Sequence, residues 1–298
     1  MYRPFGLIAM LGAAALCACS QKEAAKPDSA HVAQAGAAAA PAPASQASFD
    51  PTTRVAVVHA KDFAFDAPDS ITAGWTTFHL VNDGPNLHHV QLVRLDSGKT
   101  AQDLADAMKN PGPPPHWAVF VGGPNAPDPS TQSDATLNLA AGNYVMLCLV
   151  DIPGGVPHFT KGMVRPFKVT AASGSTGTEP TSDVAISLAD YKFNVEGTLG
   201  AGKHTIKVQN AGPQIHEIEV VRLAPGKTMK DLSAWMQKPE GPPPGNAMGG
   251  IDAILPGMTA YFTADLTPGD YLLLCFVPDA KDGKAHLEHG MVKQFKVS

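Results

Sequence analysis

The chain has 298 residues, a length that suggests about two domains. Hydrophobic residues make up 44% of it and charged residues 16%, a balance that excludes a fully disordered protein. The net charge of −5 and the aromatic content of 7% argue against binding to a phosphate backbone, so we expect no nucleic acid among its partners.

Residues 1–18 have the layout of a secretory signal, because Arg3 is followed by an apolar stretch with no further charge before Lys22. The stretch ends in Leu16-Cys17-Ala18-Cys19-Ser20, which resembles the bacterial lipobox. The resemblance implies cleavage before Cys19 and lipid attachment to it, and the serine that follows favours the outer membrane. We therefore expect a lipid-anchored protein of the cell envelope, at the periplasmic face of the outer membrane. An ordinary cleaved signal is the alternative.

Residues 19–53 are rich in Ala, Pro, Ser and Gln, a composition that predicts a disordered tether. The rest of the chain matches itself at a shift of about 128 residues. Val93-Arg94-Leu95, for example, recurs as Val221-Arg222-Leu223. The copies span about 54–170 and 183–298, and residues 171–182 link them. Two copies predict tandem domains rather than a solenoid.

Each copy contains short segments of β-branched residues, or of alternating apolar and polar residues, that are separated by Gly, Asn and Pro. Examples are residues 76–81, 87–95 and 143–150. Strands at this spacing predict an antiparallel β-sandwich. One short helix interrupts each copy, and its start is marked by a Thr with an Asp three residues later, at Thr100 and Thr228. The expected fold class is all-β, with one inserted helix per domain.

The same four side chains recur in each copy: an early His, then Cys, His and Met, spaced Cys-x9-His-x4-Met and Cys-x10-His-x4-Met. Two imidazoles, a thiolate and a weak thioether are the ligands of a blue copper centre. The alternatives are core packing of each residue, or a disulfide between the two cysteines. The predicted ligands are His88, Cys148, His158 and Met163 in the first copy and His216, Cys275, His286 and Met291 in the second. We expect two coppers per chain.

The first copy offers two adjacent histidines, and strand alternation selects between them. His88 shares a face with Val90 and Leu92, so this face is expected to point inward. His89 corresponds to Glu217 of the second copy, so we expect His89 on the surface.

These motifs resemble the cupredoxin family. Asn82-Asp83-Gly84 before His88 is similar to the turn that precedes the family's first copper histidine, and the segment from Cys148 to Met163 is similar to an expanded plastocyanin loop. The resemblance implies a Greek-key β-sandwich with copper near one end. The loop from Cys148 to His158 is longer than in plastocyanin and closer to that of copper nitrite reductases.

The residues beside each cysteine are Leu or Phe, and the chain contains no His-Cys pair that could lead to a second copper centre. We therefore expect a protein that is not an enzyme. The leading hypothesis is a one-electron carrier with a redox partner protein. A copper buffering or delivery protein is the first alternative, and a metal-free interaction module is the second.

Overall fold

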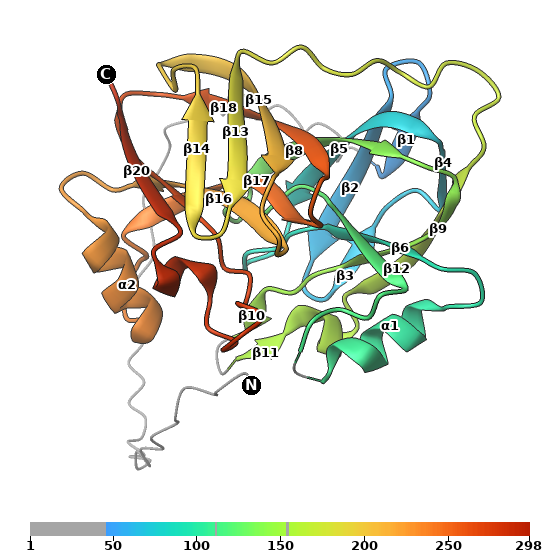
Figure 1. Cartoon of the computed structure of the whole chain (residues 1–298), viewed down its shortest axis with the longest axis horizontal. Helices are drawn as coiled ribbons and strands as arrows, with labels where there is room; N and C mark the ends of the chain where they lie inside the picture. Colours follow the sequence, from blue (N-terminus) through green and yellow to red (C-terminus); the bar gives the residue numbers. More distant parts are fainter. Residues whose placement is uncertain (1–45, 111, 153–154) are drawn as a thin grey trace, which may run out of the picture. The chain divides into compact units, whose positions relative to one another are not determined.

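The computed structural model describes residues 46–110, 112–152 and 155–298 (Figure 1). The predicted signal, Cys19 and most of the tether lie outside the described residues. Gln46–Ser298 belong to one compact unit. None of the helices among the described residues has the length and apolar character needed to cross a membrane.

The described part of the first half contains twelve strands, one α-helix and one 3₁₀ turn. They are β1 (Ser48–Asp50), β2 (Val55–Lys61), β3 (Ala64–Asp66), β4 (Ser70–Thr72), β5 (Gly74–Asn82), β6 (Gln91–Leu95), α1 (Ala101–Met108), β7 (Ala118–Gly122), β8 (Gln132–Leu139), β9 (Gly142–Leu147), β10 (Asp151–Ile152), β11 (Val156–Pro157), η1 (His158–Lys161) and β12 (Val164–Thr170).

The second half contains eight strands, one α-helix and one 3₁₀ turn. They are β13 (Val184–Ala189), β14 (Lys192–Glu196), β15 (Gly202–Asn210), β16 (His216–Leu223), α2 (Met229–Gln237), β17 (Gly245–Ile254), β18 (Thr259–Leu266), β19 (Gly269–Leu274), η2 (His286–His289) and β20 (Val292–Val297). The all-β fold class with one inserted helix per half is confirmed.

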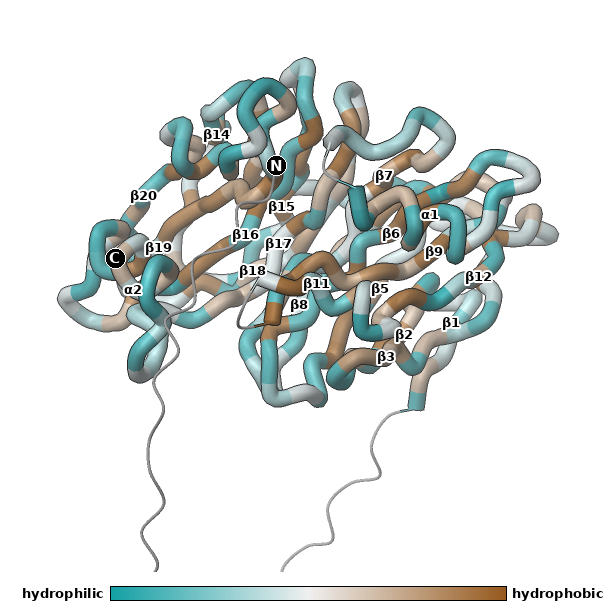
Figure 2. The backbone as a smooth tube through the Cα atoms, turned by 90° about the horizontal axis from the view of Figure 1, so that it is seen from below, coloured by the Kyte–Doolittle hydropathy of each residue, from teal (hydrophilic) through white to brown (hydrophobic). Residues whose placement is uncertain are grey.

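Local sequence explains these elements. In β5 every second residue is buried, as expected for β-branched and aromatic residues that alternate between a core face and an outer face. Both helices begin with the predicted capping box, in which Thr100 and Thr228 accept from the backbone N–H of Asp103 and Asp231. Figure 2 shows the separation of hydrophobic strands from hydrophilic loops: β16 and β19 run through hydrophobic stretches, while the peripheral loops are mostly hydrophilic.

Two departures from the predicted boundaries have simple causes. β1 lies inside the segment predicted to be a tether, and Phe49 pairs with Ala56 of β2, so the folded part begins before residue 54. β6 begins at Gln91 rather than at residue 87. The preceding chain leaves the sheet, where the Val90 N–H donates to the carbonyl of Pro124 (3.0 Å).

Both halves contribute to both large sheets. One sheet has the order β1-β2-β5-β8-β18-β15-β13-β14, with β3 paired to β2, and the other has the order β20-β19-β16-β17-β7-β6-β9-β12-β4. The halves meet where β8 pairs with β18 and β7 with β17, which we call the seam. At the seam Ala135 faces Phe262 and Pro124 faces Ile251, and the two members of each pair are related by the spacing of the sequence repeat.

The predicted linker, residues 171–182, has no regular secondary structure but is held against both halves. The Trp75 N–H of β5 donates to the carbonyl of Thr176 (2.7 Å), and the hydroxyl of Tyr261 in β18 donates to Glu179. The two halves are therefore joined by shared sheets as well as by the chain itself.

Candidate metal centres

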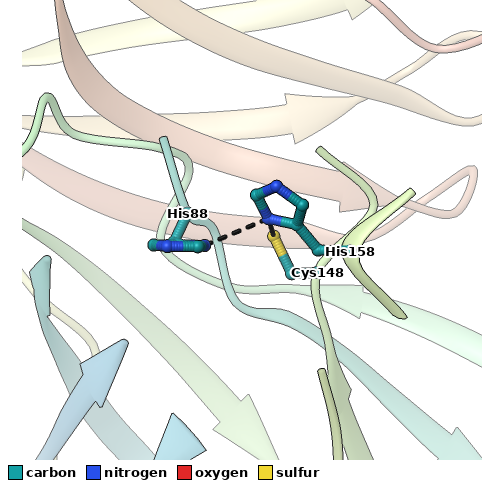
Figure 3. A group of neighbouring side chains, drawn as sticks. All are labelled: His88, Cys148 and His158. Carbon is teal, nitrogen blue, oxygen red and sulfur yellow. Dashed lines mark hydrogen bonds between the residues drawn. The ribbon is translucent and has the colours of Figure 1, made fainter. Parts of the chain in front are cut away.

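Three of the predicted ligands of the first copy converge in the interior (Figure 3). His88 lies in the loop that leads into β6, Cys148 follows β9, and His158 begins η1. The Nδ1 atoms of His88 and His158 are 3.1 Å apart, and the Cys148 Sγ is 3.5 Å from the His158 Nδ1. All three residues are fully buried.

This geometry fits a transition-metal ion. Bonds of about 2.0 Å to nitrogen and about 2.3 Å to sulfur, arranged in a trigonal plane, place the ligand atoms about 3.5 Å from one another. The Nε2 of His158 is buried and has no hydrogen-bond partner among the described residues. The ring therefore has only its Nδ1 side engaged, toward Cys148. Two imidazoles and a thiolate are a donor set that suits copper.

The fourth predicted ligand, Met163, is fully buried in the same hydrophobic cluster as Cys148. Its backbone is fixed on both sides, because the Cys148 N–H donates to the Met163 carbonyl (3.2 Å) and the Met163 N–H donates to the His158 carbonyl (3.2 Å). Gly162 sits between η1 and Met163 at φ 107°, a left-handed conformation that favours glycine. The turn thus returns the chain to Cys148.

The second copy builds the same arrangement. The Nδ1 atoms of His216 and His286 are 3.0 Å apart, and the Cys275 Sγ is 3.4 Å from the His286 Nδ1. These three residues and Met291 are all fully buried, and the Met291 N–H donates to the His286 carbonyl (3.0 Å). Cys148 and Cys275 are both free thiols, each within its own group, so the alternative of a disulfide between them is wrong.

The Asn-x-Gly turn before each first histidine has a steric reason. The Asn82 Oδ1 accepts from the Gly84 N–H (3.1 Å), which closes the turn, and the His88 ring then lies over the glycine. A Cβ on Gly84 would come within 2.6 Å of the His88 Nε2, and one on Gly212 within 2.8 Å of the His216 Nε2. Only glycine leaves room for the imidazole in this position.

A carboxylate that the ligand motif does not predict lies behind each first histidine. The His88 Nε2 lies 2.7 Å from Asp62, and the His216 Nε2 lies 3.0 Å from Asp190. A signal for them was available, because the repeat that aligns Phe63 with Tyr191 also aligns the preceding aspartates.

His89, predicted to be on the surface, is instead buried at 5% exposure. Its Nδ1 contacts the carboxylate of Asp252 in β17, and its Nε2 accepts from the Leu149 N–H (2.5 Å). The prediction was wrong because the second half covers the face of β6 that would be outward in a single domain. Glu217 and Glu219 are buried at the same seam.

Burial controls the protonation of the second group. It lowers the pKa of His286 to about 4, with the neighbouring His216 adding to the effect, and it also lowers the pKa of His216. Both rings are therefore neutral, as metal ligands must be. Burial, together with the nearby Glu217, raises the pKa of the Cys275 thiol.

No family model matches the chain, and no curated protein matches its sequence. Some solved structures resemble it in fold. The reduced auracyanin of Roseiflexus castenholzii is 20% identical, covers 40% of this chain and 95% of its own, and has a TM-score of 0.28. A multicopper oxidase is 12% identical, with 85% and 93% covered and a TM-score of 0.25. The copper-containing nitrite reductase of Thermus scotoductus SA-01 is 12% identical, with 82% and 62% covered and a TM-score of 0.23.

These comparisons correct one expectation. Because the similar structures include multicopper oxidases and a nitrite reductase, which are enzymes, the prediction that this chain is not an enzyme is withdrawn. The two His/Cys/His groups themselves support copper binding.

Proposed function

We propose that this chain is an extracytoplasmic copper protein with two type 1-like centres, each of which carries one electron to or from a partner protein. The main support is the pair of buried His/Cys/His groups. In each group the two histidine Nδ1 atoms lie within 3.5 Å of each other, and the cysteine Sγ lies within 3.5 Å of one of them. The ligands would be His88, Cys148, His158 and Met163 in one centre and His216, Cys275, His286 and Met291 in the other. The repeat suggests that the two centres arose by duplication.

Copper bound in such a set can cycle between Cu(I) and Cu(II) with little rearrangement of its ligands. The protein contributes rigidity. The carbonyls of Cys148 and Cys275 accept from the backbone N–H of Phe159 and Leu287 (both 2.9 Å), which ties each cysteine to the turn that carries the second histidine. Full burial excludes water from both groups. These features favour electron transfer over copper delivery, because delivery requires ligands that an acceptor can reach.

The test is copper reconstitution of the purified chain, followed by metal analysis, visible spectroscopy and redox titration. We expect a copper-to-protein ratio near two, intense thiolate-to-copper absorption and reversible one-electron behaviour. Zinc in both groups would contradict the blue-copper assignment. Rapid loss of copper to a mild chelator, without a reversible redox wave, would favour the delivery function instead.

We also propose that Cys19 carries a lipid anchor that holds the protein at the periplasmic face of the outer membrane. The support is the lipobox-like Leu16-Cys17-Ala18-Cys19 after an apolar stretch. Changing Cys19 to Ala should release the protein from the membrane fraction or block its processing. Unchanged fractionation and unchanged mass would reject the anchor.

A further inference from the structure

Two β-hairpin turns reach the metal centres from outside the ligand set. One joins β2 to β3 and presents Asp62 and Phe63, and the other joins β13 to β14 and presents Asp190 and Tyr191. We call these two dipeptides the hairpin tips. Each consists of an aspartate followed by an aromatic residue, and none of the four is a proposed metal ligand.

The first tip holds the first histidine through a hydrogen bond. The Asp62 Oδ1 lies 2.7 Å from the His88 Nε2, on the side of the ring opposite to the Nδ1 that faces His158. The other carboxylate oxygen, Oδ2, accepts from the Asn86 amide (2.7 Å). Both oxygens are therefore engaged and the carboxylate cannot rotate freely, although 26% of its side chain is exposed.

The second tip repeats these contacts with different neighbours. The Asp190 Oδ1 lies 3.0 Å from the His216 Nε2, and its Oδ2 accepts from the Gln214 amide (3.1 Å). In both halves the amide donor stands two residues before the histidine, as Asn in one and Gln in the other. The arrangement is thus maintained although the surrounding side chains differ.

The aromatic residue of each tip packs edge-on against the second histidine. The ring centroids of Phe63 and His158 are 5.2 Å apart at 71°, and those of Tyr191 and His286 are 5.5 Å apart at 71°. Each tip therefore contacts both imidazoles of its group, one by hydrogen bond and one by packing.

The hydrogen bond determines which imidazole nitrogen carries the proton. An ionised carboxylate can only accept, so the His88 Nε2 must donate and the Nδ1 keeps its lone pair directed at Cys148 and His158. A neighbouring carboxylate also makes the ring a stronger electron donor and fixes its orientation. A histidine that only filled the core would need no charged partner, because a backbone carbonyl could accept the same proton.

We infer that the hairpin tips are positioning devices of the two metal centres, in which Asp62 and Asp190 fix the tautomer and donor strength of the first histidine ligand. This inference rests on the proposed function, and it names residues that the ligand motif does not contain. The added negative charge stabilises the more positive Cu(II) state, so the tips lower the reduction potential of each centre.

The experiment isolates the first centre in a Cys275→Ser parent chain. In that parent, Asp62→Asn keeps an acceptor oxygen but removes the charge, and Asp62→Ala removes both. We expect Asp62→Ala to weaken copper binding about 10- to 100-fold, as for other partners of metal-ligating histidines, and Asp62→Asn to weaken it less. Both variants should raise the reduction potential. Asp62→Glu should restore part of the parent's affinity and potential.

A metal-free measurement completes the test. In the apo chain, nitrogen-detected NMR should show His88 as the Nε2–H tautomer in the parent and as a mixture of tautomers in Asp62→Ala. Asp66→Asn is the matched control, because Asp66 lies on the same hairpin and is exposed; it should change none of these values. If Asp62→Ala does not fold, as judged by circular dichroism, the copper affinity and reduction potential of Asp62→Asn test the inference.

The outcomes separate the two claims. A parent chain that binds no copper as a coloured centre contradicts the proposed function. A parent that binds copper normally, with affinity, potential and tautomer all unchanged in Asp62→Asn and Asp62→Ala, overturns the role of the hairpin tips.

Discussion

At the scale of single residues, the position after each first histidine makes the two centres different. His89 and Glu217 occupy this position, and each accepts from the backbone N–H that follows a cysteine: Leu149 donates to His89 (2.5 Å) and Phe276 to Glu217 (2.7 Å). One centre thus has an imidazole against its cysteine loop and the other has a carboxyl group. The acid contributes to raising the pKa of Cys275.

The thiolate assignment can be tested at either centre. Cys148→Ser should remove the intense visible absorption of one centre and leave that of the other, because serine cannot provide the thiolate-to-copper charge transfer. The absorption of the copper-loaded variant, compared with that of Cys275→Ser, measures each contribution. A double variant that remained coloured would show that the ligand assignment is wrong.

Glu217 should make stability depend on pH. Burial and the nearby Asp252 raise the pKa of Glu217 to about 8. Between about pH 5 and 8 the folded state therefore binds a proton that the unfolded chain has released, so the free energy of unfolding falls as pH rises. Each pH unit in this window removes about 1.4 kcal/mol, so we expect a loss on the order of 4 kcal/mol for the apo chain, measured by denaturant titration.

The variant Glu217→Gln keeps an acceptor for the Phe276 N–H and cannot ionise. It should flatten this pH dependence and be more stable than the parent at pH 8. Glu240→Gln is the control, because Glu240 is exposed. An unchanged slope in Glu217→Gln would assign the pH dependence to other groups.

At the scale of elements, short turns position the ligands more than the strands do. The strands end at the cysteines, whereas the Asn-x-Gly turns and the 3₁₀ turns η1 and η2 determine where the histidines point. These turns depend on hydrogen bonds and close approaches that tolerate little change. Substitutions in them should therefore affect metal binding more than global stability.

Gly84→Ala is the sharpest test of a turn. A methyl group here would lie 2.6 Å from the His88 Nε2, so the ring must shift from its position in the group. We expect copper affinity at the first centre to fall about tenfold or more, because misplaced ligands lose coordination geometry. Gly200→Ala is the control, since an added Cβ there meets no atom within 4 Å. Equal affinities in the two variants would contradict the steric argument.

At the scale of the whole molecule, the seam makes one cooperative unit of two similar halves. Strands from both halves are hydrogen-bonded within each large sheet, and buried polar groups cross between them. Asn125 shows this, because its side chain donates to the carbonyl of Ile218 (3.1 Å) and its backbone N–H to that of Gly250 (3.3 Å). Neither half can unfold without breaking contacts of the other.

Thermal unfolding of the apo chain should accordingly be a single calorimetric transition, with equal calorimetric and van't Hoff enthalpies. Asn125→Ala leaves the buried carbonyl of Ile218 without its donor, and should lower the free energy of unfolding by about 1–3 kcal/mol. Asn138→Ala, at an exposed position of β8, should cost less than about 0.5 kcal/mol. Two separate transitions would show that the halves fold independently.

The sequence by itself determined the features that are encoded locally. Alternation predicted strands such as β5, the Thr-x-x-Asp pattern predicted both helix starts, and the spacing of Cys, His and Met predicted the groups at Cys148 and Cys275. These features could be predicted because each depends on residues that are close together in the chain, or on a motif that occurs in both copies of the repeat.

Only the tertiary structure decided which side chains contact the histidines of these groups and how the two halves of the chain join. The partners of His88 and His89 are Asp62 and Asp252, which come from a distant hairpin and from the other half of the chain. Alternation identified the core face of β6 within one domain but could not show that the second domain covers the other face. Burial at that seam depends on how two sheets join, and no local periodicity encodes such long-range contacts.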